Sequence, residues 1–512
     1  MSLAVVYSRA SIGVEAPLVT IEVHISNGKP AFTLVGLPEK TVTEAQGRVR
    51  SALINANFKY PAKRITVNLA PADLPKEGGR FDLPIAIGIL AASGQLDGKH
   101  LQSYELLGEL ALTGQLRGVQ GIIPAILAAE KAKRHLIIAE KNANEAALVS
   151  QQETYYAPNL LAVVNFLNQQ QSLPLASDAI SEIPPPTLTS TRDMTDIIGQ
   201  QHAKRALTIA AAGQHNLLFL GPPGTGKTML ASRLTDLLPE MSDSEAIETA
   251  SVTSLVQNEL NFHNWKKRPF RAPHHSASMP ALVGGGTVPK PGEISLAHNG
   301  VLFLDELPEF ERKVLDALRQ PLESGEIIIS RANAKIQFPA RFQLIAAMNP
   351  SPTGHYTGTH NRTSPQQVMR YLNRLSGPFL DRFDLSIEVP LLPQGTLQKL
   401  DQSSERGESS AEIRERIIMA RQIQLQRAGK VNAYLSSKEI ETFCKIGEKE
   451  AIFLENALNK LGLSVRAYHR ILKVARTIAD LENEKDIQQK HLAEALGYRA
   501  MDRLLQKLGK EL

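Results

Sequence analysis

Short β-branched runs alternate with helical patterns over residues 1–170. LVTIEVHI and RITVNLAP are predicted to be strands, and DLPIAIGILAASG and IIPAILAAEKAK are predicted to be helices. This alternation favours a mixed α/β domain at the start of the chain.

A second series of apolar runs is typical of a parallel sheet flanked by helices. The helical run AKRALTIAAAG precedes the apolar run NLLFL, and strand, turn and helix recur at VLFLDE and FQLIAAMN. From AEIRERIIMARQIQLQR to HLAEALGYRAMDRLLQKL, apolar residues recur at three- and four-residue spacing. The pattern therefore predicts an α/β core over residues 193–392 and a helical lid over residues 411–512.

Two segments without apolar periodicity separate these domains. Residues 171–192 contain SEIPPPTLTSTR, and residues 393–410 contain a polar run from Asp401 to Ser410. Because both are rich in Pro, Ser and Thr, we expect them to be linkers.

Composition narrows the class of protein. A chain of 512 residues is too long for one hydrophobic core, and 43% hydrophobic with 21% charged residues is ordinary for soluble proteins. We find no apolar run long enough to cross a bilayer and no secretory signal, and the single cysteine, Cys444, suits a reducing compartment. We therefore expect a cytoplasmic protein. The net charge of +5 permits a polyanionic partner but is small for this length.

The glycine-rich turn after NLLFL carries a phosphate-binding pattern. Residues 221–228 fit G-x-x-x-x-G-K-[ST] between an apolar strand and a helix. Glycines let backbone N–H groups point at phosphate, and the positive end of the following helix faces the same way. We expect Lys227 to reach the β- and γ-phosphates and Thr228 to hold Mg²⁺. The predicted ATP-binding residues are Gly221, Pro222, Pro223, Gly224, Thr225, Gly226, Lys227 and Thr228.

Two further apolar runs end in polar residues of catalytic type. Val301 to Leu304 lead into Asp305 and Glu306, the pattern of a Walker B motif. Asp305 is expected to hold the Mg²⁺ shell, and Glu306 to orient and polarise the attacking water. The next run ends at Asn349, which occupies the position of a sensor 1 residue or, alternatively, simply opens a turn before a proline.

Two arginines are candidates for contact with ATP. Arg382 lies in SGPFLDRFDL beside Asp381 and Asp384, either as an arginine finger that reaches a neighbouring subunit's ATP or as part of a surface ion-pair network. Arg466 opens a long predicted helix and is similar to a sensor 2 arginine that folds back onto the nucleotide. The alternative is an exposed helical arginine.

Together these motifs resemble the magnesium-chelatase-like branch of the AAA+ ATPases, in which a helical insertion and an extra β-hairpin decorate the core. RPFRAPHHSASMPALVGGG matches the insertion, and SGEIIISRANAKIQFPARFQLIAAMNP matches the hairpin. With GLPEKTVTEAQGRVRSAL and LAPADLPKEGGRFDLPIAIGIL included, the whole chain resembles the ComM/YifB group.

The resemblance implies a fold and a function. The expected architecture is an α/β AAA+ P-loop core between an N-terminal Lon-protease-like α/β domain and a C-terminal helical lid. The expected activity is that of a hexameric, ATP- and Mg²⁺-dependent DNA helicase that promotes branch migration during homologous recombination, notably in natural transformation. Its partners would be single-stranded and branched duplex DNA, further copies of itself as a homohexamer, and recombination proteins.

The sequence departs from related patterns at two places. Lon-type proteases carry their nucleophile in PKDGPSAG, whereas Arg80 stands at the serine position in PKEGGRFD, and the partner lysine falls near Ile123. This excludes peptide hydrolysis by that route. Many relatives also carry a Cys-x-Cys…Cys-x-Cys zinc set, and the corresponding residues here are Ser351, Thr353, Asn361 and Thr363.

Four histidines bear on this zinc question. Because the thiolates are replaced, we expect no zinc and read His355 and His360 as solvent-facing loop residues. His274 and His275 are interpreted as packing or hydrogen-bonding groups, with a role in subunit coupling left open.

We expect the hairpin tip to contact DNA phosphates in a central pore. Arg331 and Lys335 flank the tip between strands 326–330 and 335–338, where cations can grip phosphates without reading sequence. The alternative is a solvated hairpin whose charges discourage edge pairing. A second basic cluster could share the work; it comprises Lys266, Lys267, Arg268 and Arg271.

The motifs leave a second function open. A chelatase-type ATPase that remodels a partner protein would share the same catalytic core. A transcriptional activator would need a GAFTGA loop, which we do not find.

Overall fold

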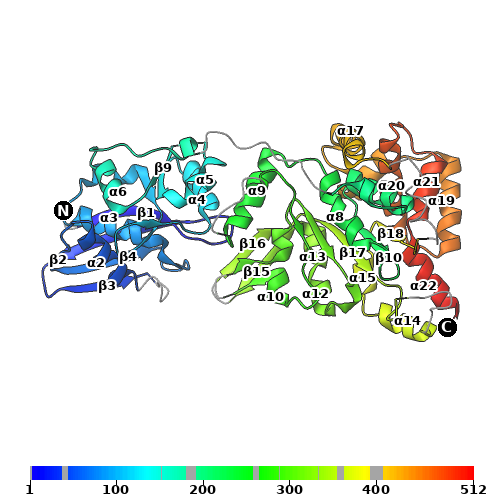
Figure 1. Cartoon of the computed structure of the whole chain (residues 1–512), viewed down its shortest axis with the longest axis horizontal. Coiled ribbons are helices and arrows are strands. Elements are labelled where there is room, and N and C mark those ends of the chain that lie inside the picture. The colour runs from blue at the N-terminus through cyan, green and yellow to red at the C-terminus, as the bar shows by residue number, and fades with distance from the viewer. Residues whose placement is uncertain are drawn as a thin grey trace.

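The computed structural model describes residues 3–36, 44–151, 153–179, 192–257, 264–286, 289–331, 334–354, 363–392 and 407–511, without the side chains of Arg331 and Ala334. The chain forms an elongated row of an N-terminal α/β domain, a central α/β core and a C-terminal group of helices (Figure 1). The predicted fold class is confirmed. Within the described ranges, no helix is both long and apolar enough to span a bilayer.

The N-terminal domain is built on a seven-stranded mixed sheet in the order β3-β4-β2-β1-β5-β8-β9. Its strands are β1 Leu3–Arg9, β2 Leu18–Ser26, β3 Ala31–Val35, β4 Arg64–Ala70, β5 Tyr104–Leu106, β8 His135–Ala139 and β9 Thr154–Ala157. The short strands Glu109–Leu110 (β6) and Leu116–Arg117 (β7) form a separate ladder. The helices are α2 Ala45–Asn55, α3 Asp82–Ala92, α4 Ile122–Lys131, α5 Ala143–Ala147 and α6 Leu160–Leu167.

Helix α3 explains why DLPIAIGILAASG is apolar on every face. It packs on β1 and β2 and is covered by α2, so nearly all of its residues are buried. A helix that is apolar all round is stable only in such an interior position. Gly88 allows the close approach to the sheet, because a Cβ there would lie 2.5 Å from Val23.

The central core is a five-stranded parallel sheet in the order β11-β14-β17-β10-β18. Its strands are β10 Leu217–Leu220, β11 Phe270–Arg271, β14 Val301–Leu304, β17 Gln343–Met348 and β18 Leu385–Glu388. Its helices are α7 Gln201–Gly213, α8 Lys227–Leu237, α9 Asp243–Ser254, α10 Met279–Val283, α11 Glu293–Leu296, α12 Arg312–Ala317, α13 Arg319–Ser324, α14 Pro365–Leu372 and α15 Gly377–Leu380. The inner strands are buried on both faces, which accounts for their continuous apolar runs.

Two hairpins extend from this core. The small one joins Gly284–Gly285 (β12) to Lys290–Pro291 (β13), and the larger one joins Glu326–Arg331 (β15) to Ala334–Pro339 (β16). The larger hairpin confirms the strands predicted at IIIS and KIQF. Its two faces differ, because Ile329 and Ile336 are buried whereas Lys335 is exposed.

In the C-terminal residues that the structure describes, 407–511, the α-helices are α17 Ser410–Ala428, α18 Ser437–Phe443, α19 Glu448–Leu461, α20 Val465–Leu481, α21 Gln489–Gly497 and α22 Ala500–Glu511. Helices α17 and α20 pack on α7 of the core. The last helix instead packs beside β18 and α14, and the Met501 amide donates to Ser386 Oγ at 2.9 Å. The predicted lid is therefore helical, but its final helix belongs to the core surface.

The N-terminal domain contacts the core near both hairpins. The Gly121 amide donates to the Ser254 carbonyl at the end of α9 (2.7 Å), and Lys290 Nζ of β13 lies 3.4 Å from Gln120 Oε1. At the larger hairpin, Ile12 packs against the group of buried apolar side chains that includes Ile336 of β16. Figure 1 shows β15 and β16 on the side of the core that faces this domain.

Candidate nucleotide-binding site

The phosphate-binding loop lies between β10 and α8. Strand β10 is an inner strand between β17 and β18, so the loop after it lies at the carboxyl end of the sheet, beside the loops that follow its neighbours. Gly224 and Gly226 adopt φ values of 78° and 86°, which side chains disfavour. At Gly221 a Cβ would clash with the carbonyl oxygen of Val389. The loop conformation therefore depends on these glycines.

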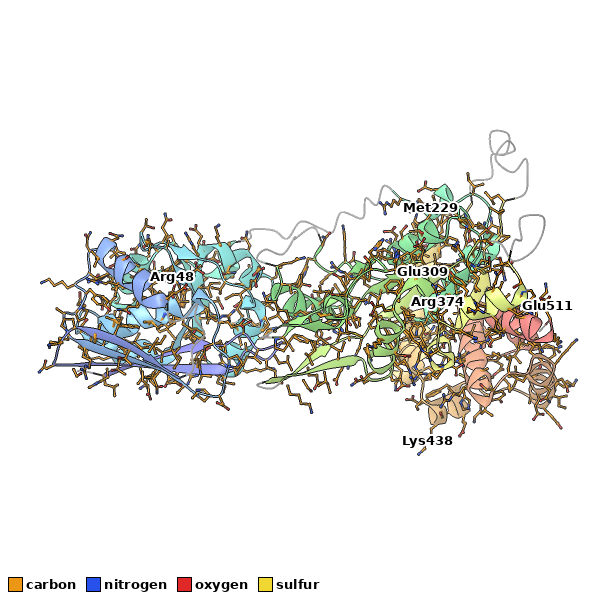
Figure 2. All side chains as sticks on the ribbon, turned by 90° about the horizontal axis from the view of Figure 1, so that it is seen from below. Arg48, Met229, Glu309, Arg374, Lys438 and Glu511 are labelled. Carbon is orange, nitrogen blue, oxygen red and sulfur yellow. The ribbon has the colours of Figure 1, made fainter. Side chains whose placement is uncertain are left out.

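A cavity of about 420 Å³ is lined by this loop and by the two neighbouring strand ends: Pro223, Gly224, Thr225, Gly226, Lys227, Thr228, Met229, Asp305, Glu306, Met348 and Asn349. The three sequence motifs thus meet at one place. The cavity opens to the surface, where Met229 is 47% exposed and can be located in Figure 2.

Lys227 sits against the backbone of the loop. Its Nζ donates to the carbonyls of Gly221 (2.7 Å) and Pro222 (2.8 Å) and to Asn349 Oδ1 (3.2 Å). Burial lowers the pKa of this amine, and the charges of Asp305 and Glu306 oppose that shift. The contact with Asn349 joins the loop to the predicted sensor 1 position.

Thr228 and Asp305 form a pair of hard oxygen donors. Thr228 Oγ1 donates to Asp305 Oδ2 at 2.6 Å, and Asp305 Oδ1 accepts from the Glu306 amide at 2.9 Å. Hydroxyl and carboxylate oxygens are ligands that Mg²⁺ takes at nucleotide sites, usually together with water and phosphate oxygens. The donor set therefore fits Mg²⁺ bound with a nucleotide.

Glu306 begins the turn that follows Walker B. Its φ of 51° is in the left-handed region, and the one-turn helix Leu307–Glu309 (η7) starts immediately after it. Arg374 holds this turn by donating to the Pro308 carbonyl (3.3 Å) and to Glu309 Oε2 (2.9 Å). Figure 2 shows Glu309 and Arg374 near each other in the core. Glu306 is among the residues that line the cavity, where a water-polarising group must be.

Arg382 lies outside the cavity that its own chain forms. It pairs with Glu323 of α13, an ion pair that is in keeping with the surface-network alternative; among the described residues its ion-pair partner is this glutamate and not Asp381 or Asp384. Asp381 instead accepts from Arg470 of α20 at 2.8 Å. This contact ties the arginine loop to the C-terminal helices.

Arg466 also lies away from the cavity, at the start of α20. Its role as a sensor 2 arginine that folds back onto the nucleotide stays a prediction, because Arg466 is not among the residues that line the cavity. Arg466 is close enough to Arg382 to act on it electrostatically: burial first, and then the positive charges of Arg319, Arg466 and Arg470, lower the pKa of the Arg382 guanidinium. We name Arg319, Arg382, Arg466 and Arg470 the arginine cluster.

Comparisons with known proteins identify the family. Residues 193–397 match the family described as magnesium chelatase, subunit ChlI, residues 21–142 match subunit ChlI of Mg-chelatase, and residues 407–499 match its C-terminal part. The chain is 81% identical to competence protein ComM of Haemophilus influenzae over 99% of both chains, and 58% identical to YifB of Escherichia coli over the whole of both. The chain belongs to the ComM/YifB family of magnesium-chelatase-like AAA+ ATPases. The magnesium-chelatase 38 kDa subunit of Rhodobacter capsulatus is 29% identical over 38% of this chain and 54% of its own.

Residues of the second basic cluster form ion pairs inside this ComM/YifB family member. Arg268, with 8% of its side chain exposed, forms a two-pronged pair with Glu245 at 3.1 Å. Arg271 does the same with Glu293 at 2.6 Å, and Lys266 pairs with Asp243 at 2.7 Å. Arg268 is therefore too enclosed to contact DNA, and Arg271 is held in a structural pair.

Of the two hairpin residues predicted to contact DNA, the structure describes the side chain of Lys335 but not that of Arg331. Lys335 is exposed on β16, opposite Ser330. Arg331 is the last residue of β15, and its side chain lies outside the described atoms, as do residues 332–333 of the tip.

In the N-terminal domain of this ComM/YifB family member, a buried arginine, Arg80, stands at the position of the Lon-type nucleophile. Arg80 is 6% exposed and donates to the carbonyls of Arg9 (3.4 Å) and Gln120, and burial lowers its pKa to about 10. Ile123, near the expected lysine position, is fully buried in α4. Arg80 thus supports the loop that contacts α9 and β13.

The zinc-set positions that the structure describes carry hydroxyls that pair with each other. Ser351 and Thr353 lie 3.2 Å apart, and Thr353 and Thr363 lie 2.9 Å apart. Asn361, His355 and His360 lie outside the described residues.

One contact at the hydrolytic site was not predicted from the sequence, and it comes from a histidine of the insertion. His275 Nδ1 lies 3.2 Å from Glu306 Oε2. The consecutive histidines were noted in the sequence, but their distance from Walker B along the chain concealed this contact.

Proposed function

We propose that this protein is an ATP-driven DNA motor that works as a homohexameric ring in the cytoplasm. In this proposal it promotes branch migration during homologous recombination of DNA taken up in natural transformation. Full-length similarity to a protein named as a competence protein supports the biological setting. Recombination proteins and branched or single-stranded DNA would be its partners.

ATP hydrolysis in this proposal follows from the cavity. Bound Mg²⁺ would neutralise phosphate charge, with Thr228 and Asp305 holding it. Lys227 would exchange its carbonyl partners for the β- and γ-phosphates, Asn349 would orient the γ-phosphate, and Glu306 would polarise the attacking water.

The observation that carries the ring is the separation of the arginine cluster from the cavity. Arg382 and Arg466 do not line the cavity of their own chain. Within the arginine cluster, Glu323 pairs with Arg382 and Asp381 with Arg470. Four arginines outnumber these two carboxylates, and the phosphates of a neighbouring subunit's ATP would supply further negative charge. Each ATP site would then be completed by a second copy of the chain.

A strand-exchange assay tests the motor function. The purified protein is incubated with ATP, Mg²⁺ and a synthetic three-stranded or four-way junction, with Glu306→Gln as the matched variant that is expected to bind ATP and turn it over slowly. We expect ATP-dependent exchange by the wild type alone. Hydrolysis without exchange on any junction would reject the motor and favour the chelatase-type alternative, in which a partner protein rather than DNA stimulates the ATPase.

A further inference from the structure

The consecutive histidines of the insertion meet the hydrolytic site through one of their rings. His275 Nδ1 lies 3.2 Å from Glu306 Oε2, and the His275 ring packs on His274 (4.1 Å between centroids) and, edge to face, near Phe310 (6.4 Å). His275 itself does not line the nucleotide cavity. We propose that His275 is a positioning residue that holds the Glu306 carboxylate in place to polarise the attacking water.

The sheet explains how a residue distant along the chain reaches Glu306. Strands β11 and β14 are parallel neighbours, with Phe270 opposite Val301 and Arg271 opposite Leu302. The chain that leaves β11 therefore emerges at the same sheet edge as the chain that leaves β14. His275 follows β11 by four residues, and Glu306 follows β14 by two.

The segment that carries His275 is fixed at both ends. Before it, Arg271 is clamped by both carboxylate oxygens of Glu293 at 2.6 Å. At the other end, the turn of residues 274–277 is closed by the Ala277 amide, which donates to the His274 carbonyl (2.9 Å), a backbone contact that does not depend on the His274 side chain. The His275 ring is therefore presented by a constrained backbone.

Glu306 needs such support because its side chain is 56% exposed. A long exposed carboxylate samples many rotamers, and a polarising group works only in the few that place it within hydrogen-bonding reach of the water. Contact of Oε2 with His275 restricts those rotamers. Within the part of the chain that the structure describes, Oε1 has no hydrogen-bond partner and remains able to accept from a water. A base oriented by a third group is a common catalytic arrangement.

The inference rests on the proposed role of Glu306 in ATP hydrolysis and is independent of DNA. The test therefore uses the full-length protein and steady-state ATP hydrolysis without DNA, with ATP affinity measured separately from a fluorescent ATP analogue. His275→Ala should lower kcat by about tenfold or more and leave nucleotide affinity unchanged, because a misplaced polarising group affects turnover more than binding.

Two variants separate positioning from packing. His275→Asn should recover much of the rate, because its amide can donate from near the place of Nδ1. His274→Ala is the matched control, since it removes the neighbouring ring but no atom in contact with Glu306, and it should keep a near-wild-type rate. Thermal melting of each variant shows whether the fold is retained.

A double variant decides the mechanism. If His275 acts through Glu306, then adding His275→Ala to Glu306→Gln should cause no further loss of turnover. An unchanged or raised kcat in His275→Ala, or an equal loss in both backgrounds, overturns the inference. Wild-type turnover by Glu306→Gln would instead overturn the assignment of the polarising group, and with it the mechanism of hydrolysis proposed above.

Discussion

Replacing Arg268 by alanine should destabilise the core and leave DNA affinity unchanged in the folded protein. The guanidinium is only 8% exposed, pairs twice with Glu245 at 3.1 Å, and donates to the carbonyls of Pro239 and Asn299 at 2.8 Å. Removing one partner of a buried pair costs about 3–5 kcal/mol. Because the Glu245 side chain is 35% exposed, water offsets part of this loss, and we expect about 2–3 kcal/mol.

This loss of folding stability should lower the Tm of the unfolding transition that involves the core. For a domain of 150–250 residues, 1 kcal/mol shifts Tm by about 2–4 °C, so we expect a decrease of about 4–12 °C by calorimetry or circular dichroism. Lys266→Ala is the control, because Lys266 pairs with an Asp243 side chain that is 81% exposed, and such surface pairs contribute about 0–1 kcal/mol. An Arg268→Ala protein that melts with the wild type and binds DNA more weakly would refute the structural role.

Three further predictions address the ring, the hairpin and the thiol. Mixing Arg382→Ala subunits with Lys227→Ala subunits should restore some ATP hydrolysis, because some interfaces then pair an intact loop with an intact arginine; no recovery in demonstrated mixed rings would contradict a role across subunits. Arg331→Ala with Lys335→Ala should weaken DNA binding, reduce its log–log salt slope by roughly one per lost contact and stop branch migration with basal ATPase retained; unchanged binding and migration would direct the search elsewhere. Burial raises the pKa of Cys444 to about 11, so at pH 8 roughly one thiol in a thousand is ionised, and alkylation by iodoacetamide should be slow until the fold is lost; rapid alkylation of the folded protein would show an accessible thiolate.

The nucleotide site could be predicted from sequence because its parts follow strand ends. Lys227, Asp305 and Asn349 each follow an apolar run, and the carboxyl ends of parallel strands meet at one edge of a sheet. The same logic applies to His275, but β11 is only two residues long and has no apolar periodicity that would mark it as a strand.

The positions of the arginines could not be predicted in this way. Sequence identifies the helix that begins at Val465, yet only the packing of α20 shows that Arg466 lies with Arg382 instead of over its own cavity. Similarly, Arg268 and Arg271 read as a basic patch because their partners, Glu245 and Glu293, are more than twenty residues away along the chain.

The contact of the N-terminal domain with both hairpins has a mechanical consequence. Gln120 meets β13 and Ile12 packs against the hairpin of β15 and β16, so a tilt of the hairpins would turn the attached domain as a lever. Seven strands at about 4.8 Å spacing make a sheet about 30 Å wide, and a 10° rotation across that width moves its far edge by about 5 Å. A pair of fluorophores on the two domains would then report any tilt of the hairpins during turnover.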